Sequence, residues 1–141
     1  MKECYISMIY KRELEALFRE IDTCSKCPLK ADTKVYHRGD YSPEIVFIGE
    51  APGKEEEKCG APFVGRSGEL LQEFIWDYVK RSYAITNICK CRPPNNRTPT
   101  REEINVCGEY TIRLLNFYNP KVIIPLGRSA YSYFKKITTN Y

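Results

Sequence analysis

The sequence has no long apolar stretch and almost no histidine. Its longest apolar runs are about five residues, far short of the roughly 20 that a membrane-spanning helix requires. The residues after Met1 do not form the apolar core of a signal peptide, so we expect an intracellular, cytoplasmic protein with no membrane partner. The single histidine, His37, lies in a polar stretch, and we assign it no role. The sequence also has neither an internal repeat nor a low-complexity tract.

Acidic residues are missing from one part of the chain. Between Lys80 and Arg101 there are six basic residues and no acidic one. Residues 80–141 carry 11 Lys and Arg against three Glu, a net charge of +8, whereas residues 1–79 have a net charge of −4. A basic half indicates a polyanionic partner. A solvated basic surface explains the charge equally well.

The chain has 141 residues, which is the usual size of one domain, and we predict a single domain over residues 1–141. Three short apolar runs predict buried strands, and helical spacing and caps predict the helices beside them. This alternation indicates an α/β fold with right-handed crossovers. Three strands are fewer than a sheet usually has. The expected strands are 45–48, 83–88 and 122–127, and the expected helices are 10–22, 67–79 with Ser67 as N-cap, 100–118 with a capping box at Thr100, and 128–134.

Two turns rich in glycine and proline follow the first predicted strand. Its apolar residues run directly into Gly49-Glu50-Ala-Pro-Gly53, and the second turn carries Phe63. Asn87 ends the next predicted strand. Open α/β sheets bind ligands outside the carboxyl ends of their strands. We therefore predict a pocket there, built largely from backbone around one carboxylate and one aromatic ring.

Cysteine is frequent for an intracellular chain, with seven residues. This usage favours metal or redox chemistry over a disulfide framework. Cys24 and Cys27 form a C-x-x-C loop, while Cys91 follows the second strand and Cys107 lies on the inner face of a predicted helix. Four such thiolates can hold a tetrahedral zinc or an iron–sulfur cluster, and spacing alone does not choose between them. Cys89 is an alternative ligand, because strand alternation sends it the same way as Cys91.

Several of these motifs occur together in an order that resembles the iron–sulfur uracil-DNA glycosylases called family 4. They are CxxCPL, GEAPG with APFVGRSG, TNxxKCRPPNNRTPTxEE and the later Cys107, spread over roughly residues 20–130. The resemblance implies a three-layer α/β/α fold with a small parallel sheet. It implies an enzyme of base excision repair that cleaves the N-glycosidic bond of uracil in DNA. It also implies a structural [4Fe-4S] cluster, held here by Cys24, Cys27, Cys91 and Cys107.

The resemblance assigns roles within a uracil pocket. Phe63 is expected to stack on a base flipped out of the duplex, and Asn87 to accept from uracil N3–H and donate to O4. Glu50 is expected to position the attacking water and stabilise the cationic sugar. Backbone N–H groups at Ala51 and Gly53 are expected to hold uracil O2 and the developing anion. Phosphate contacts are expected from the basic loop, through Lys90, Arg92, Arg97 and Arg101.

One part of the family pattern is not found in the sequence up to Tyr141. It is a His-Pro turn after a fourth strand, whose histidine donates to uracil O2, and losing such a donor costs about 10²–10³ in rate. We therefore expect a fold truncated at the C-terminal strand, with weakened activity or with a second chain or homodimer completing the sheet. The alternative is a non-catalytic iron–sulfur module that binds DNA or a replication or repair protein. Zinc is the alternative to the cluster.

Overall fold

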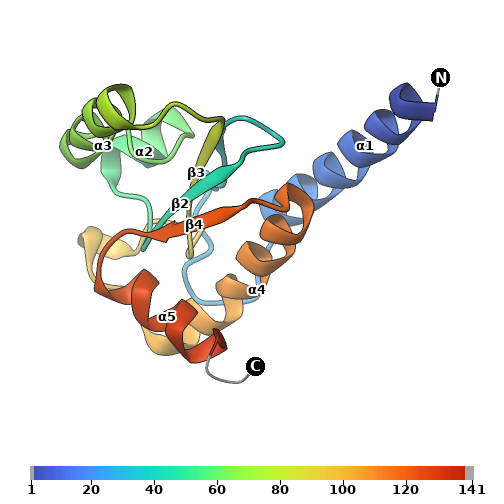
Figure 1. Cartoon of the computed structure of the whole chain (residues 1–141). Helices are drawn as coiled ribbons and strands as arrows, with labels where there is room; N and C mark the ends of the chain where they lie inside the picture. The colour runs from blue at the N-terminus through green and yellow to red at the C-terminus, as the bar shows by residue number, and fades with distance from the viewer. Residues whose placement is uncertain (1, 139–141) are drawn as a thin grey trace.

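The computed structural model describes residues 2–138, and side chains from residue 7 onward within that range. Strands and helices alternate along most of the chain (Figure 1). No helix in the described part is both long enough and apolar enough to cross a membrane. The elements are α1 (Lys2–Asp22), β1 (Arg38–Gly39), β2 (Ile45–Gly49), α2 (Lys54–Cys59), α3 (Arg66–Tyr78), β3 (Tyr83–Asn87), a 3-10 turn (Pro94–Asn96), α4 (Arg101–Tyr118), β4 (Val122–Pro125) and α5 (Arg128–Thr138).

The sheet has four strands in the order β1-β3-β2-β4. β2 lies parallel to both β3 and β4, as the sequence predicted, and Gly49 pairs with Asn87. The carboxyl ends of β2 and β3 are therefore level at one edge of the sheet. β1 was not predicted. It contributes only two residues and runs antiparallel to β3.

Helices cover both faces of the sheet, with α2 and α3 on one side and α1, α4 and α5 on the other (Figure 1). Alternate strand residues point to opposite faces. Phe47 and Ile85 pack with Leu71 and Ile75 of α3. The other face holds the larger core, in which β2 and β3 pack against α1, α4 and α5. The predicted three-layer α/β/α architecture is confirmed.

The helix ends follow the predicted caps at α4 but not at α3. Thr100 caps α4, because its hydroxyl accepts from the Glu103 N–H at 3.2 Å and its own N–H donates to Glu103 at 2.8 Å. The prediction that Ser67 caps α3 is wrong. Gly65 occupies the N-cap position in an extended conformation. Its N–H donates to Glu56 Oε2 at 2.9 Å, which fixes the turn before the helix.

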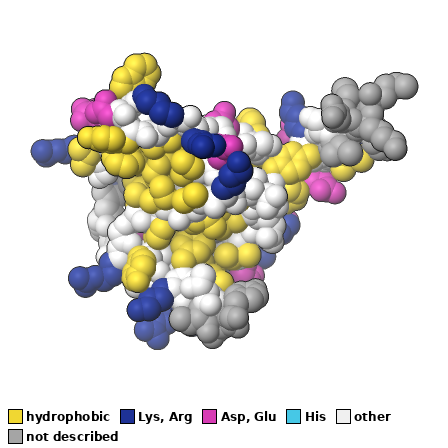
Figure 2. All heavy atoms as spheres, viewed as in Figure 1, with side chains coloured by type: hydrophobic (Ala, Val, Ile, Leu, Met, Phe, Trp, Pro, Cys, Tyr) yellow, Lys and Arg dark blue, Asp and Glu magenta, His cyan; other side chains and the backbone are white. Residues whose placement is uncertain are grey.

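Among the described residues, two of the surfaces that expose large apolar side chains are the free edge of the sheet at β4 and the outer face of α3. β4 is an edge strand, and Val122 and Ile123 on it are 47% and 39% exposed. The outer face of α3 is the second surface, and Figure 2 shows hydrophobic side chains reaching the surface over this helix. On α3 they are Leu70, Phe74, Trp76 and Tyr78.

Candidate functional site

A pocket of about 320 Å³ lies at the carboxyl ends of β2 and β3. Its volume is at the lower end of the range for small-molecule sites. Four of the residues predicted for the site line this one pocket, although they come from separate segments of the chain. They are Glu50, Ala51, Phe63 and Asn87.

Asn87 and Phe63 meet over Gly49 in the floor of the pocket. Asn87 is 2% exposed, and within residues 2–138 no hydrogen bond involves its carboxamide, whereas its backbone carbonyl accepts several. A Cβ atom on Gly49 would lie 2.5 Å from Asn87 Oδ1 and 2.5 Å from Phe63 Cζ. Only glycine lets the amide and the ring approach each other here. The carboxamide is therefore available to form hydrogen bonds with a ligand in the pocket.

The Phe63 ring is held by its backbone. Its φ of +55° is left-handed, which costs about 1–2 kcal/mol for a residue with a side chain. Arg38 Nη1 donates to the Phe63 carbonyl at 2.8 Å. A Cβ atom on Gly68 would lie 1.8 Å from that same carbonyl oxygen, so α3 also packs directly against the loop. These contacts hold Phe63 in a conformation that the isolated loop would not favour.

Glu56 joins the two turns that form the pocket. Its carboxylate accepts from the N–H groups of Gly53 at 3.0 Å, Val64 at 3.2 Å and Gly65 at 2.9 Å. Sequence reasoning gave it no specific role, although its position three residues after Gly53 has capping-box spacing. Gly53 does not line the pocket, and its N–H is committed to Glu56. The structure thus uses the Gly53 N–H to join the two turns, whereas Glu50 and Ala51 are the predicted turn residues that line the pocket.

Glu50 is half-buried and has a partner that the sequence did not reveal. Its Oε2 accepts a hydrogen bond from the Ser129 hydroxyl in the first turn of α5. The available signal was the position of Ser129 shortly after the third predicted strand, because carboxyl ends of parallel strands meet at one edge. This contact fixes one carboxylate oxygen of a side chain that also lines the pocket.

The four predicted cysteines line a second, smaller cavity of about 20 Å³, on the side of the sheet covered by α4. They come from the loop after α1, the loop after β3, and α4 itself. Its lining also contains four lysines but no acidic residue and no histidine. Thiolates are soft ligands that suit iron–sulfur clusters and zinc. As the side chains stand, no three His, Cys, Asp or Glu within the described residues are arranged to hold a single metal ion. The four cysteine thiolates are nevertheless suitable ligands for an iron–sulfur cluster or for zinc.

The thiol of Cys107 has neighbours that favour its thiolate form. The Cys89 thiol hydrogen-bonds to it and the positive charge of Lys90 lies nearby, and together they lower the pKa of Cys107 despite its burial. The Lys90 N–H also donates to Cys107 Sγ at 3.2 Å. Cys89 is fully buried and does not line the cavity. Because the thiolate is the ligand form, Cys107 fits the predicted ligand set and Cys89 acts as its hydrogen-bond donor.

The prediction that Lys90 contacts DNA is wrong. Its side chain is 1% exposed and is directed into the protein. Its ammonium donates to Thr86 Oγ1 at 3.0 Å, to Thr111 Oγ1 at 2.9 Å and to the Asn87 carbonyl. Burial lowers the pKa of Lys90 to about 8. A lysine in this position has no access to a phosphate.

The three arginines of the basic loop differ in their freedom. Arg92 donates to Asn96 at 2.7 Å and lies 3.5 Å from Glu57. Arg97 makes a two-pronged contact with the buried carboxylate of Glu103, at 2.9 and 2.8 Å. Arg101 is exposed at the start of α4. The loop is therefore fixed in shape by ion pairs, and Arg101 is the most available of the three for an outside partner.

Comparison with known proteins places these features in a family. Residues 36–141 match the family model described as "Uracil DNA glycosylase superfamily". Among the relatives are proteins that carry the name "Type-4 uracil-DNA glycosylase". The protein of Thermotoga maritima is 42% identical over 132 residues, covering 89% of this chain and 69% of the relative. Those of Archaeoglobus fulgidus and Sulfurisphaera tokodaii are 47% identical over 121 residues and 41% identical over 134 residues, covering 83% and 91% of this chain. The chain spans 61% of the length of each of these last two.

Proposed function

This chain belongs to the type-4 uracil-DNA glycosylases of the uracil DNA glycosylase superfamily, and from that premise we propose that it cleaves the N-glycosidic bond of uracil in DNA. The observation that carries the proposal is the convergence of Glu50, Phe63 and Asn87 on one pocket. A ring can bind the face of a base, a carboxamide can bind its edge, and a carboxylate can stabilise the sugar cation left behind.

Base selection in this proposal depends on Asn87. Phe63 stacks on the flipped base, which offsets part of an unstacking cost of a few kcal/mol. The Asn87 carboxamide accepts from uracil N3–H and donates to O4. Cytosine has an acceptor at N3 and a donor at position 4, so the same amide orientation leaves both contacts unpaired. Unpaired buried polar groups cost about 1–3 kcal/mol each, which favours uracil.

Bond cleavage in this proposal depends on Glu50 and Ala51. The leaving base takes the electron pair of the C1′–N1 bond, and the sugar becomes cationic. The Glu50 carboxylate stabilises that cation and orients the water whose hydroxyl adds to C1′, while the remaining proton goes to the base. The Ala51 N–H is available for the charge that develops on uracil O2. Ser129 keeps Glu50 oriented toward the pocket.

We also propose that Cys24, Cys27, Cys91 and Cys107 hold a [4Fe-4S] cluster, with zinc as the alternative. All four line one cavity and no hard ligand shares it, which supports a soft-metal group. Such a group would tie the loop after α1, the loop after β3, and α4 to one another. Absorbance near about 400 nm distinguishes an iron–sulfur cluster from colourless zinc. Metal analysis that finds neither metal with these cysteines contradicts the proposal.

DNA contact is proposed for Arg92, Arg97 and Arg101, which lie in the loop after β3 and at the start of α4. Uracil-containing DNA is the partner that this charge and the pocket support. A second chain is proposed at the free edge of β4, because exposed edge strands are the usual place for a further strand to pair. A second copy in that position would make specific activity rise with protein concentration.

The test is strand cleavage at abasic sites. Purified protein is incubated with a single-stranded oligonucleotide containing one uracil, at two protein concentrations, and then treated with alkali. We expect cleavage with uracil and none with cytosine at the same position. Glu50→Ala and Asn87→Ala should each reduce the rate by about 10²–10³.

Glu55→Ala is the matched control, because Glu55 is exposed on α2 and does not line the pocket. It should retain the rate of the unmodified protein. Equal rates in all variants contradict the proposed site. Salt-dependent DNA binding with no cleavage at either concentration would instead support the non-catalytic DNA-binding module.

A further inference from the structure

Lys90 is a buried cation whose donors are all used. An ammonium group has three hydrogens, and the three acceptors are Thr86 Oγ1, Thr111 Oγ1 and the Asn87 carbonyl. Burying a charge is costly unless it is fully hydrogen-bonded. Each of these acceptors belongs to the end of β3 or to the inner face of α4. The side chain is therefore committed to the segment that carries Asn87.

The backbone of the same residue contacts the cysteine-lined cavity. The Lys90 N–H donates to Cys107 Sγ at 3.2 Å, and its carbonyl accepts from the Val35 N–H at 2.8 Å. One residue earlier, the Cys89 N–H donates to the Glu50 carbonyl at 3.0 Å. The short segment 87–91 thus contacts both proposed pocket residues and the proposed cluster ligands. Lys90 lies where these contacts meet.

We propose that Lys90 is a positioning residue. It lies on the side of the cysteine-lined cavity and holds the Asn87 backbone, so that the Asn87 carboxamide stays in place to bind the base. This inference rests on the proposed function. Thr111 Oγ1 lies 3.3 Å from the Asn87 carbonyl and 3.1 Å from the Ile88 carbonyl, so its hydroxyl holds the same short stretch of backbone as the Lys90 ammonium. The peptide between Asn87 and Ile88 follows the last residue pair of the β2–β3 ladder. The N–H of this peptide, on Ile88, donates to the Gly49 carbonyl at 2.9 Å, so the peptide is held from both sides. Loss of the donors on its carbonyl leaves one of these two anchors and loosens the backbone that carries the Asn87 side chain.

A role for Lys90 as a simple counter-charge to the cluster fits the contacts less well. Within the described residues the hydrogen bonds of its ammonium go to oxygen atoms and none goes to sulfur. The sulfur contact belongs to the backbone N–H, which any residue except proline would provide. Replacing the side chain should therefore change the position of Asn87 more than it changes the cluster.

The experiment compares Lys90→Met and Thr111→Val with the unmodified holoprotein. A misplacement of about 1 Å at a reacting centre can cost about 10²-fold in rate. We expect kcat on the uracil oligonucleotide to fall by about that factor in Lys90→Met, and by less in Thr111→Val. KM for the oligonucleotide and cluster absorbance per chain should stay within about twofold. Lys11→Met is the matched control, because Lys11 is exposed on α1 and does not line the pocket.

Three outcomes overturn the inference. The first is an unchanged kcat in Lys90→Met, and the second is a kcat loss that only parallels lost cluster. If Lys90→Met does not fold, an unchanged kcat in Thr111→Val has the same force. If the unmodified protein releases no uracil, the proposed function fails separately. Amide exchange then decides the positioning role, because the N–H groups of Ile88 and Cys89 should exchange faster in Lys90→Met than in Lys11→Met.

Discussion

Glu56 illustrates how one side chain can determine the shape of a pocket whose walls are backbone. Its carboxylate accepts from three N–H groups in two turns, and the second of these turns carries Phe63 directly before Val64 and Gly65. Phe63 adopts a left-handed conformation. Without the carboxylate, three backbone donors lose their partner and the strained loop is free to relax. The ring that we propose for stacking therefore depends on a carboxylate that is not proposed to touch the base.

Glu56→Ala is expected to lower both stability and activity. Hydrogen bonds to a charged group contribute about 1.5–3 kcal/mol, so the free energy of unfolding should fall by at least that range, measured by urea denaturation. Uracil release should fall as well, because Phe63 loses its fixed position. Glu56→Gln keeps an acceptor oxygen and should recover part of both losses. Glu55→Ala, at an exposed neighbouring position, is the control. If Glu56→Ala matches this control in both stability and uracil release, the proposed role of Glu56 is contradicted.

The sequence was enough to name residues that line one pocket, but several of their partners could not be predicted. Glu50, Phe63 and Asn87 follow strand ends or glycine turns, where side chains are directed to ligands. Lys90 was misjudged because it lies among basic residues, and charge alone does not tell which of them turns inward. Ser129 was missed because its contact with Glu50 spans 79 positions along the chain. Such contacts depend on the assembled sheet.

α4 is the element that links the basic loop to the core. Glu103 caps its first turn and also holds Arg97, and this ion pair has one buried member and one exposed member. The hydrogen bond from Arg97 is the largest of the effects that lower the pKa of Glu103. The loop proposed to meet DNA is thus anchored to a helix end.

Glu103→Gln should destabilise the protein in a pH-dependent way. A carboxyl group with a lowered pKa stabilises the folded state above its usual value of about 4.5, and that contribution is lost as the pH falls through the lowered pKa. We expect a loss of about 1.5–3 kcal/mol at neutral pH and a smaller difference from the unmodified protein in acid. Urea unfolding of both proteins across this pH range measures it. A difference that is independent of pH, or matched by the exposed Glu102→Gln, contradicts the expectation.

The buried strands and long helices were predictable because burial leaves a periodic pattern. β2, β3 and β4 follow the predicted apolar runs, and α4 follows its capping box. β1 pairs through only two residues, and α2 has six residues with none buried, so neither leaves a pattern to detect. α1 begins at Lys2, earlier than predicted, because the sequence shows an apolar face only in its second half. The elements that sequence analysis did not predict are therefore those that bury little surface.

Charge is distributed unevenly over the chain as a whole. The C-terminal part has a net charge of +8, but its basic residues have different surroundings. Lys90 is buried behind the pocket, and Arg97 is paired with Glu103. Arg101 is exposed and lines a surface cavity together with Ser129, the partner of Glu50. Arg81 lies at the other end of β3, where it pairs with Glu44 at 3.3 Å. A phosphate backbone that reaches the base pocket should therefore meet Arg101 and not Arg81.

Arg101→Ala should weaken DNA binding and its salt dependence together. Each phosphate contact contributes about 0.7–1 to the slope of log K against log salt concentration. We expect the magnitude of the slope to fall by about that amount in Arg101→Ala, measured by fluorescence anisotropy with a labelled oligonucleotide at several salt concentrations. Arg81→Ala is the charge-matched control and should leave the slope unchanged. Equal slopes in the two variants contradict this orientation of DNA.

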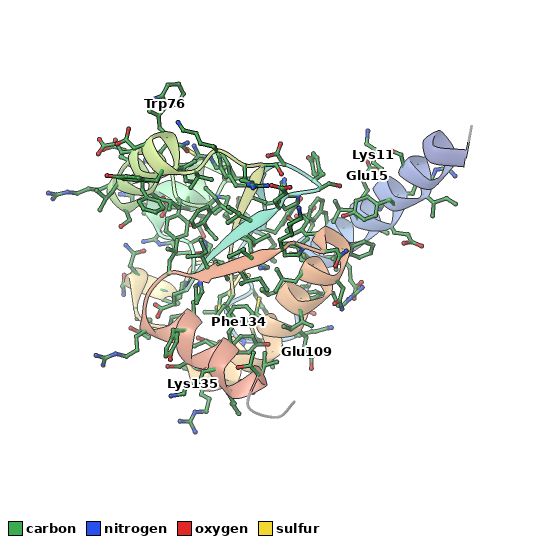
Figure 3. All side chains as sticks on the ribbon, in the orientation of Figure 1. Lys11, Glu15, Trp76, Glu109, Phe134 and Lys135 are labelled. Atoms are coloured by element: carbon green, nitrogen blue, oxygen red, sulfur yellow. The ribbon has the colours of Figure 1, made fainter. Side chains whose placement is uncertain are left out.

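Trp76 determines which optical signals can be used to study this protein. It is the only tryptophan in the sequence, it is 80% exposed, and Figure 3 shows it extending from α3 away from the rest of the molecule. Its indole already emits from water in the folded state, so unfolding will change its fluorescence little. A base that stacks on Phe63 will also leave this emission unaltered. Circular dichroism will therefore report folding, and a fluorescent base analogue in the DNA will report occupation of the pocket.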